Sequence, residues 1–173
     1  MGGRRLRRVV FDEARLAARV SQIGREISEH YPAGEKLLVL GLLKGSFIFL
    51  ADLVRRIHLP LQVDFLVASS YGDRVTSSGT VDFLYDPDVQ VTDRHVIVVE
   101  DIVDSGTTLK ELLPRLERRR PKSLEVCVLL HKRLIQLDPE PRWVGFEAPG
   151  EFLVGYGLDH AEDFRHLPFI GSL

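Results

Sequence analysis

The segment VIVVEDIVDSGTTL, residues 96–109, determines how the rest of the chain is interpreted. Four apolar residues lead directly into Glu100 and Asp101, and Asp104 opens a run of small residues. An apolar run of this kind is typical of a buried strand, and hydroxyl residues after it are typical of a helix start. In open parallel sheets, ligands bind beyond the carboxyl ends of the strands. The segment is therefore the first candidate for a binding site.

The residue types in this segment suit a phosphorylated sugar. Glu100 and Asp101 can accept hydrogen bonds from neighbouring sugar hydroxyls, and Asp104 can transfer a proton. Hydroxyls and backbone N–H groups at a helix start suit a monophosphate, and they come from Ser105, Gly106, Thr107 and Thr108. The alternative is an ordinary helix cap at Asp104 or Ser105, with the other acids in solvent. A cap needs only one such residue, so the whole string favours a binding site.

The flanking sequence predicts strands that alternate with helices. Apolar runs predict buried strands at 37–43, 63–70, 95–101 and 123–132, and an alternating run predicts a short strand at 80–86. Helical spacing predicts helices from about Asp12 to before Tyr31, over 47–57 and over 107–119. Pro114 should kink or shorten the last of these. The alternation implies right-handed crossovers and an α/β fold with a mostly parallel sheet.

The character of the chain changes after residue 133, where aromatic residues, Gly and Pro become frequent and the helical period is lost. We expect this segment to form a small cap over the sheet. A length of 173 residues suits one domain. We therefore predict a single domain over 1–173, with a core at about 9–132 and a hood segment at about 133–173.

Composition argues against several classes of partner. Lys and Arg total 23 and Asp and Glu total 25, a net charge of −2, which gives no electrostatic case for nucleic acid or membrane as a partner. No apolar stretch is long enough to span a bilayer, and the N terminus does not read as a signal peptide. The single cysteine, Cys127, cannot form an internal disulfide, so we expect a reduced, cytoplasmic setting.

Several motifs together resemble the type I phosphoribosyltransferase family, in its hypoxanthine–guanine branch. Residues 96–109 resemble the phosphoribosyl-pyrophosphate motif of that family. Four further segments match in family order, namely LLKGS at 42–46, SSYGDRVTSSG at 69–79, LLHKR at 129–133 and the C-terminal stretch 144–171. The resemblance covers the chain from about residue 9. It implies the fold of that family, a central, mostly parallel twisted sheet flanked by helices, with a small base-binding hood formed largely by the C-terminal segment.

The resemblance also implies an activity. Members transfer the 5-phosphoribosyl group of phosphoribosyl pyrophosphate to hypoxanthine or guanine and release pyrophosphate, which salvages purines as IMP or GMP. The ribosyl centre becomes oxocarbenium-like, so positioning and electrostatics should dominate catalysis. Mg²⁺ is the implied cofactor, near Glu100 and Asp101, with a second ion at Asp159. A homo-oligomer, dimer or tetramer, is implied as well.

The family's functional residues can be placed on this sequence one by one. Phosphoribosyl pyrophosphate would be bound by Leu43, Lys44, Gly45, Glu100, Asp101, Ser105, Gly106, Thr107, Thr108 and Arg165. The purine would be bound by Asp104, Lys132, Phe152, Leu153 and Asp159. Asp104 would act as general acid/base at the purine N7, and Ser70 and Tyr71 would close over the site. Lys132 would donate to the 6-oxo group. The resemblance further implies that the Leu43–Lys44 peptide bond can be cis.

The sequence departs from the family pattern at two positions and leaves some alternatives open. Thr107 stands where some members have lysine, and His160 where tyrosine is common. His131 has no assigned role, and a structural one is favoured. One alternative is a regulatory protein that binds phosphoribosyl pyrophosphate without salvage chemistry, and another is a transferase for xanthine. A third is a dinucleotide-binding Rossmann protein, but this chain lacks the G-x-G-x-x-G turn of that class. The preference between hypoxanthine and guanine is left open.

Overall fold

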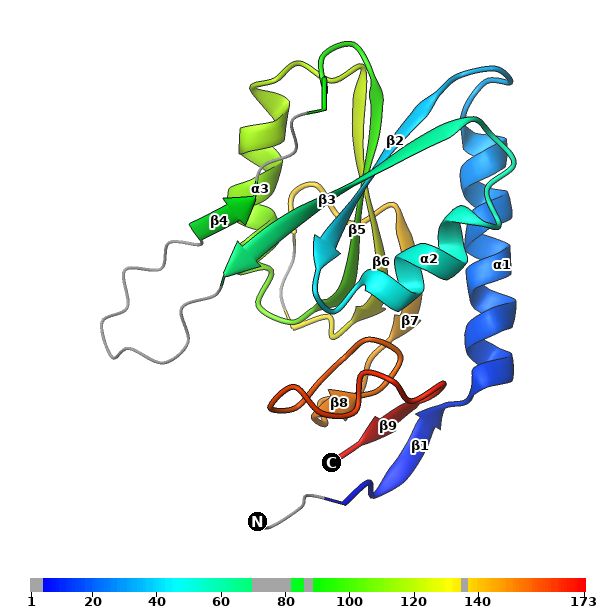
Figure 1. Ribbon diagram of the computed structural model, residues 1–173, viewed down its shortest axis with the longest axis vertical. Coiled ribbons are helices and arrows are strands. Elements are labelled where there is room, and N and C mark those ends of the chain that lie inside the picture. The colour runs from blue at the N-terminus through cyan, green and yellow to red at the C-terminus, as the bar shows by residue number, and fades with distance from the viewer. Residues whose placement is uncertain (1–4, 70–81, 86–88, 135–136) are drawn as a thin grey trace.

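The computed structural model describes residues 5–69, 82–85, 89–134 and 137–173, which form three helices and two sheets (Figure 1). The helices are α1 (Glu13–His30), α2 (Phe47–Val54) and α3 (Thr107–Glu117). The strands are β1 (Arg8–Phe11), β2 (Leu37–Leu43), β3 (Leu61–Ser69), β4 (Asp82–Tyr85), β5 (His95–Val103), β6 (Ser123–His131), β7 (Trp143–Glu147), β8 (Leu153–Val154) and β9 (Ile170–Ser172).

The main sheet has the strand order β4-β3-β2-β5-β6-β7. All neighbouring strands in it are parallel except β3 and β4, which are antiparallel. β5 lies between β2 and β6, so the segment 96–109 begins at the centre of the sheet. The prediction of an α/β fold with a mostly parallel sheet is confirmed.

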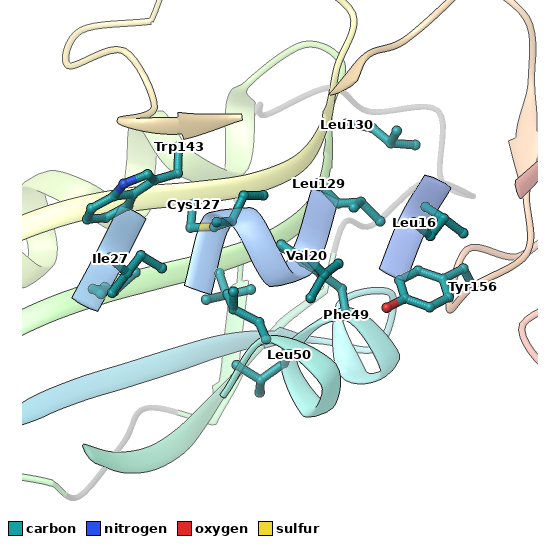
Figure 2. Packing of buried hydrophobic residues seen from close by; sticks show 14 of the residues in the cluster. Leu16, Val20, Ile27, Phe49, Leu50, Cys127, Leu129, Leu130, Trp143 and Tyr156 are labelled. Atoms are coloured by element: carbon teal, nitrogen blue, oxygen red, sulfur yellow. The ribbon is translucent and has the colours of Figure 1, made fainter. Parts of the chain in front are cut away.

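The apolar runs are continuous because the sheet is covered on both faces. Alternate residues of each central strand enter two different clusters. One cluster contains Leu37, Val39, Ile97, Val99, Cys127 and Leu129, with α1 and α2 packed on it. The other contains Leu38, Leu40, Val96, Val98, Val126 and Val128, with α3 packed on it. Figure 1 shows α1 and α2 on one side of the sheet and α3 on the other, and Figure 2 shows Val20 of α1, Phe49 of α2 and Leu129 of β6 meeting in the first cluster.

The predicted helices form, with shifted ends. The side chain of Asp12 caps α1 by accepting a hydrogen bond from the Arg15 N–H at 2.8 Å. The buried face of α1 is Leu16, Val20, Ile23, Gly24 and Ile27, at helical spacing. Pro114 lies in the last turn of α3 and does not end it, since the helix continues to Glu117. β5 extends to Val103, two residues beyond the predicted end of that strand.

The small sheet is assembled from both ends of the chain, in the order β1-β9-β8. β1 pairs antiparallel with β9, placing Arg8 opposite Ser172. β7 belongs to the main sheet and is parallel to β6. A boundary at residue 132 therefore does not separate the two sheets, because β7 of the main sheet follows it and β1 of the small sheet precedes it. The reason is that short strands carry little sequence signal and take their partners from distant parts of the chain.

The small sheet is tied to the helical layer by a side-chain hydrogen bond. The hydroxyl of Tyr156, just after β8, donates to the Asp52 carboxylate of α2 at 2.6 Å. Burial, and then the bonded carboxylate, raise the pKa of Tyr156 well above its usual value. The phenol therefore remains protonated and able to donate throughout the physiological range. Among the described residues, no helix combines the length and apolar character needed to cross a membrane.

We expect Tyr156→Phe to lower the free energy of unfolding by about 1 kcal/mol, because it removes this hydrogen bond to Oδ2 of Asp52, while Arg55 still contacts the other carboxylate oxygen. Denaturant unfolding followed by circular dichroism measures the loss. Asp52→Asn keeps an acceptor oxygen next to the phenol and should cost less. Equal stability of Tyr156→Phe and the unchanged protein would show that the bond does not fasten the two layers.

Candidate active site

Four loops meet at the carboxyl ends of the parallel strands, on the side where the small sheet lies (Figure 1). They follow β2, β5, β6 and β8 in the chain. Because β2, β5 and β6 are neighbours in one sheet, their ends lie side by side. This is the position at which open α/β sheets bind ligands.

The loop between β5 and α3 lines a cavity of about 360 Å³. Its walls are Glu100, Ile102, Val103, Asp104, Ser105, Gly106, Thr107 and Thr108. Gly106 is the residue before α3 and has φ +69°, a left-handed conformation that a residue with a side chain rarely adopts. The hydroxyls of Ser105 and Thr107 lie 3.0 Å apart at this helix start. Small residues, hydroxyls and backbone N–H groups thus surround a space suited to a phosphate group.

A second cavity of about 230 Å³ adjoins the first, and Glu100 and Thr108 line both. Its other walls are Leu42, Leu43, Lys44, Gly45, Asp101, Asp159 and Arg165. The Leu43–Lys44 peptide bond is cis, as the family resemblance implied. The two cavities therefore bring together residues from three separate sequence motifs, at 42–46, 96–109 and 144–171.

Gly45 and Asp101 are packed against each other. A Cβ atom on Gly45 would lie 1.8 Å from the Oδ2 atom of Asp101, closer than any real Cβ contact. Only glycine fits at this position while the carboxylate keeps its place. The segment after β8 packs against the same loop, since a Cβ atom on Gly157 would lie 2.2 Å from the Gly45 carbonyl oxygen.

The two acids at the end of β5 are held in an environment that disfavours their charge. Burial, and then the Asp101 carboxylate, raise the pKa of Glu100 well above its usual range. Burial raises the pKa of Asp101 to about 6, although backbone N–H groups and Arg165 act in the opposite direction. Carboxyls perturbed in this way are typical of functional sites, where a ligand or cation relieves the cost of their charge.

The described residues contain no group of three or more His, Cys, Asp or Glu side chains close enough to hold a metal ion by themselves. Mg²⁺, however, is commonly held by one or two carboxylates together with water and substrate phosphates. Asp159 lines the same cavity as Glu100 and Asp101, and its charge contributes to the raised pKa of Asp101. These hard oxygen donors, in a cavity that also holds Lys44 and Arg165, fit Mg²⁺ bound together with a substrate phosphate.

The cations of the second cavity are paired with acids from the loop after β8. Nζ of Lys44 lies 3.2 Å from Oε1 of Glu162. The guanidinium of Arg165 contacts Asp159 at 2.8 Å and Glu162 at 3.5 Å, and it donates to the Gly157 carbonyl at 2.8 Å. Glu162 therefore bridges both cations, a role that the sequence analysis missed. Its only sequence signal is its position three residues from both Asp159 and Arg165.

Lys132 and Asp104 form an ion pair at the edge of the first cavity, with Nζ 2.8 Å from Oδ2. The lysine side chain is mostly buried, with 13% of its surface exposed, whereas that of Asp104 is 55% exposed. The pair forms because β5 and β6 are in register, with Val103 opposite His131, and each residue follows closely after its strand.

The remaining predicted site residues lie on the small sheet or outside the described part of the chain. Phe152 is half exposed, and its ring lies 5.3 Å from that of His160. Leu153 is buried at the start of β8. Ser70 and Tyr71, the predicted catalytic-loop residues, lie outside the described residues.

Comparison with known proteins identifies the family. The family model described as the phosphoribosyl transferase domain matches residues 10–161. The chain belongs to the phosphoribosyltransferase family. The resemblance seen in the sequence motifs is thus confirmed, and the dinucleotide-binding alternative is excluded.

Relatives of this phosphoribosyltransferase are similar over nearly their whole length. A hypoxanthine phosphoribosyltransferase of Salmonella typhimurium is 44% identical over 167 residues, which cover 95% of this chain and 94% of the relative. A hypoxanthine-guanine phosphoribosyltransferase of Dictyostelium discoideum is 43% identical and covers 96% and 95%. The solved structure of a hypoxanthine-guanine phosphoribosyltransferase from Bacillus anthracis is 42% identical, with a TM-score of 0.90, over 98% of this chain and 99% of that one.

We expect Gly45→Ala to lower phosphoribosyl transfer by this phosphoribosyltransferase by about tenfold or more, because overpacking displaces either the Asp101 carboxylate or the loop that carries Lys44. Steady-state rates measure the loss. Gly150→Ala is the matched control, since nothing lies within 4 Å of the added methyl group there. Equal rates for Gly45→Ala and the unchanged enzyme would show that the close contact is not needed for activity.

Proposed function

We propose that this phosphoribosyltransferase transfers the 5-phosphoribosyl group from phosphoribosyl pyrophosphate to hypoxanthine and guanine, forming IMP or GMP and pyrophosphate in purine salvage. The observation that carries the proposal is the Lys132–Asp104 pair, 2.8 Å apart at the edge of the first cavity. The names of the relatives, hypoxanthine and hypoxanthine-guanine phosphoribosyltransferases, support the same substrates.

The two cavities suit the two ends of phosphoribosyl pyrophosphate. The 5′-phosphate would lie in the first cavity, against the hydroxyls and N–H groups of residues 105–108. The pyrophosphate would lie in the second, between Lys44 and Arg165. Because Glu100 lines both cavities and Asp101 lines the second, their carboxylates would face the ribose that joins the two ends. Each carboxylate can accept hydrogen bonds from the ribose hydroxyls.

The Lys132–Asp104 pair suits one edge of a 6-oxopurine. The 6-oxo group and N7 are neighbours on that edge, so an ammonium and a carboxylate at hydrogen-bonding distance from each other can contact both. The ammonium would donate to the 6-oxo group, and the carboxylate would accept the N7 proton. Adenine carries an amino group at this position, which would leave a buried donor facing a donor. This argument favours 6-oxopurines over adenine.

The reaction breaks the bond between C1 of the ribose and the pyrophosphate oxygen and forms a bond from C1 to the purine N9. Asp104 would take the N7 proton as N9 attacks, which keeps electron density on the attacking nitrogen. Lys44 and Arg165 would stabilise the charge that collects on the leaving pyrophosphate. Bound Mg²⁺, held by Glu100, Asp101 and Asp159, would neutralise the pyrophosphate and help to order the ribose hydroxyls.

Four further residues predicted from the sequence complete the proposed site. Phe152 would stack on the purine, and the backbone of Leu153 would contact its edge. Ser70 and Tyr71 would close over the bound substrates and exclude water. A homo-oligomer, dimer or tetramer, and a cytoplasmic location also belong to the proposal, the latter on the evidence of one unpaired cysteine that is fully buried.

A single experiment tests the substrate assignment. The purified protein with phosphoribosyl pyrophosphate and Mg²⁺ is offered hypoxanthine, guanine, xanthine and adenine in parallel, and the nucleotide products are separated and quantified. IMP and GMP are expected, with little or no AMP. Absence of product with both hypoxanthine and guanine would overturn the proposal, and product with xanthine alone would move the substrate to another oxopurine.

The proposed roles of Lys132 and Asp104 predict different kinetic effects. Lys132→Ala should raise the KM for hypoxanthine and guanine and weaken the discrimination against adenine. Asp104→Asn should lower kcat by about 10²-fold or more, because a general base is lost while the geometry is kept. Lys122→Ala is the control, since that lysine pairs with Glu35 near the start of β6. Unchanged use of hypoxanthine and guanine by Lys132→Ala would show that the purine binds elsewhere.

The pairing of Glu162 with both cations predicts competition with pyrophosphate. The Glu162 carboxylate contacts Lys44 and Arg165, the two cations proposed to bind pyrophosphate, so the two anions would compete for the same partners. Glu162→Gln should therefore bind pyrophosphate more tightly and be inhibited by it at lower concentration. The control is Asp163→Asn, which removes the same charge at the neighbouring exposed position. Weaker pyrophosphate binding by Glu162→Gln would instead make the carboxylate a support for the two cations.

A further inference from the structure

His131 is the residue that the sequence left without a role, and the structure places it directly before Lys132. It ends β6, and none of its surface is exposed. Among the described residues it is one of three fully buried polar side chains, with Ser46 and Ser172. A histidine is seldom buried completely without a specific partner, because its polar nitrogens lose their contact with water.

The imidazole of His131 is hydrogen-bonded to the backbone of Arg133, the residue after Lys132. Nδ1 of His131 accepts a hydrogen bond from the Arg133 N–H at 2.8 Å. Arg133 has φ +55°, in the left-handed region that residues other than glycine rarely adopt. Such a conformation persists only where its surroundings hold it. The hydrogen bond to His131 is a contact that can do this.

The backbone at His131 and Lys132 is fixed by β5 on one side and by the residue after β7 on the other. Its N–H donates to the Val103 carbonyl of β5 at 3.0 Å, and the His131 carbonyl accepts from the Ala148 N–H at 2.9 Å. With the Arg133 N–H held by the imidazole, the chain is bonded at three successive residues. The ammonium of Lys132 then reaches Asp104 at 2.8 Å.

The hydrogen bond defines the state of the ring. A ring nitrogen that accepts an N–H must be unprotonated, so the neutral tautomer carries its proton on Nε2. Nε2 has no hydrogen-bond partner among the described residues, and its nearest acid is the Glu140 carboxylate at 3.8 Å. The charged groups that face the ring are Arg133 and Glu140 on the following loop and Glu147 on β7. Burial, and then Arg133, lower the pKa of His131, so the neutral ring prevails at pH 7.

We propose that His131 is a positioning residue for purine recognition, whose neutral imidazole holds the turn at Arg133 so that Lys132 points at the 6-oxopurine edge. The inference rests on the proposed function, because it takes Lys132 to be the residue that binds the purine. His131 does not touch the substrate in this role. It acts through the backbone of the residue that does.

Two consequences separate this role from a purely structural one. Loss of the acceptor should weaken purine binding and leave the binding of phosphoribosyl pyrophosphate unchanged, because Lys44, Arg165 and residues 105–108 lie on other loops. Protonation of the ring should have the same effect as loss of the acceptor, because Nδ1–H cannot accept the Arg133 N–H. Purine affinity should therefore fall as the pH falls through the lowered pKa of His131.

The test compares His131→Leu with His131→Asn. Leucine removes the acceptor, whereas the Oδ1 atom of asparagine occupies nearly the place of Nδ1 and can accept the same hydrogen bond. His131→Leu should raise the KM for hypoxanthine about five- to tenfold, the equivalent of one net hydrogen bond, with the KM for phosphoribosyl pyrophosphate unchanged. His131→Asn should restore the KM for hypoxanthine to nearly that of the unchanged enzyme.

The pH profile provides a second readout that does not depend on how well His131→Leu folds. The ratio of the KM for hypoxanthine in the unchanged enzyme to that in His131→Asn should rise as the pH falls below the usual pKa of histidine, since the pKa of His131 is lowered, asparagine does not titrate and the other groups are common to both enzymes. A flat ratio would overturn the proposal, as would equal increases of both KM values in His131→Leu. If the unchanged enzyme had no activity on any 6-oxopurine, the proposed function would be contradicted. That result differs from the two results that would contradict the role of His131.

Discussion

The site depends on one constraint, the direct pairing of β2 with β5 at the centre of the main sheet. This pairing brings the loop that carries Lys44 against the acidic end of β5, and the two approach so closely that position 45 has no room for a side chain. Gly45, Asp101 and the adjoining cavity form one unit. The remaining parts of the site, from β6 and from the small sheet, are arranged around this contact.

The cations of the site are paired with its acids. Lys132 pairs with Asp104, Lys44 with Glu162, and Arg165 with Asp159 and Glu162. The purine edge would contact both members of the Lys132–Asp104 pair, whereas pyrophosphate would take the place of Glu162 beside Lys44 and Arg165. Solvent-exposed pairs such as Lys44–Glu162 contribute little to stability, so the loss of such a pair to a charged ligand costs little. Glu100 and Asp101 differ from these paired acids, because burial opposes their charge. Among the described residues, no cation forms an ion pair with either carboxylate.

The central sheet could be predicted because its strands are covered on both faces and so read as uninterrupted apolar runs. The same holds for α1, whose buried residues recur at helical spacing. β1 could not be predicted, since only Phe11 of its four residues is buried and its partner β9 lies at the other end of the chain. The positions of Lys132 and Asp104 in their motifs were evident, but their contact follows from the register of β5 and β6. The role of Glu162 depends on two consecutive left-handed residues, Ala161 and Glu162, which neither periodicity nor residue type reveals.

The small sheet joins the ends of the chain to the chemistry of the site. β9 holds both β1 and β8, so the segment between β8 and β9, which contains Asp159 and Arg165, is anchored at both its ends in this sheet. Tyr156 fastens the start of that segment to α2, and Gly157 packs against Gly45. The segment is therefore held by contacts at its boundaries, while several of its inner residues adopt left-handed conformations that carry acids toward Lys44 and Arg165. The Lys44–Glu162 pair in its middle is exposed, so a ligand can replace it while the backbone hydrogen bonds at Gly157 and His160 keep the segment folded.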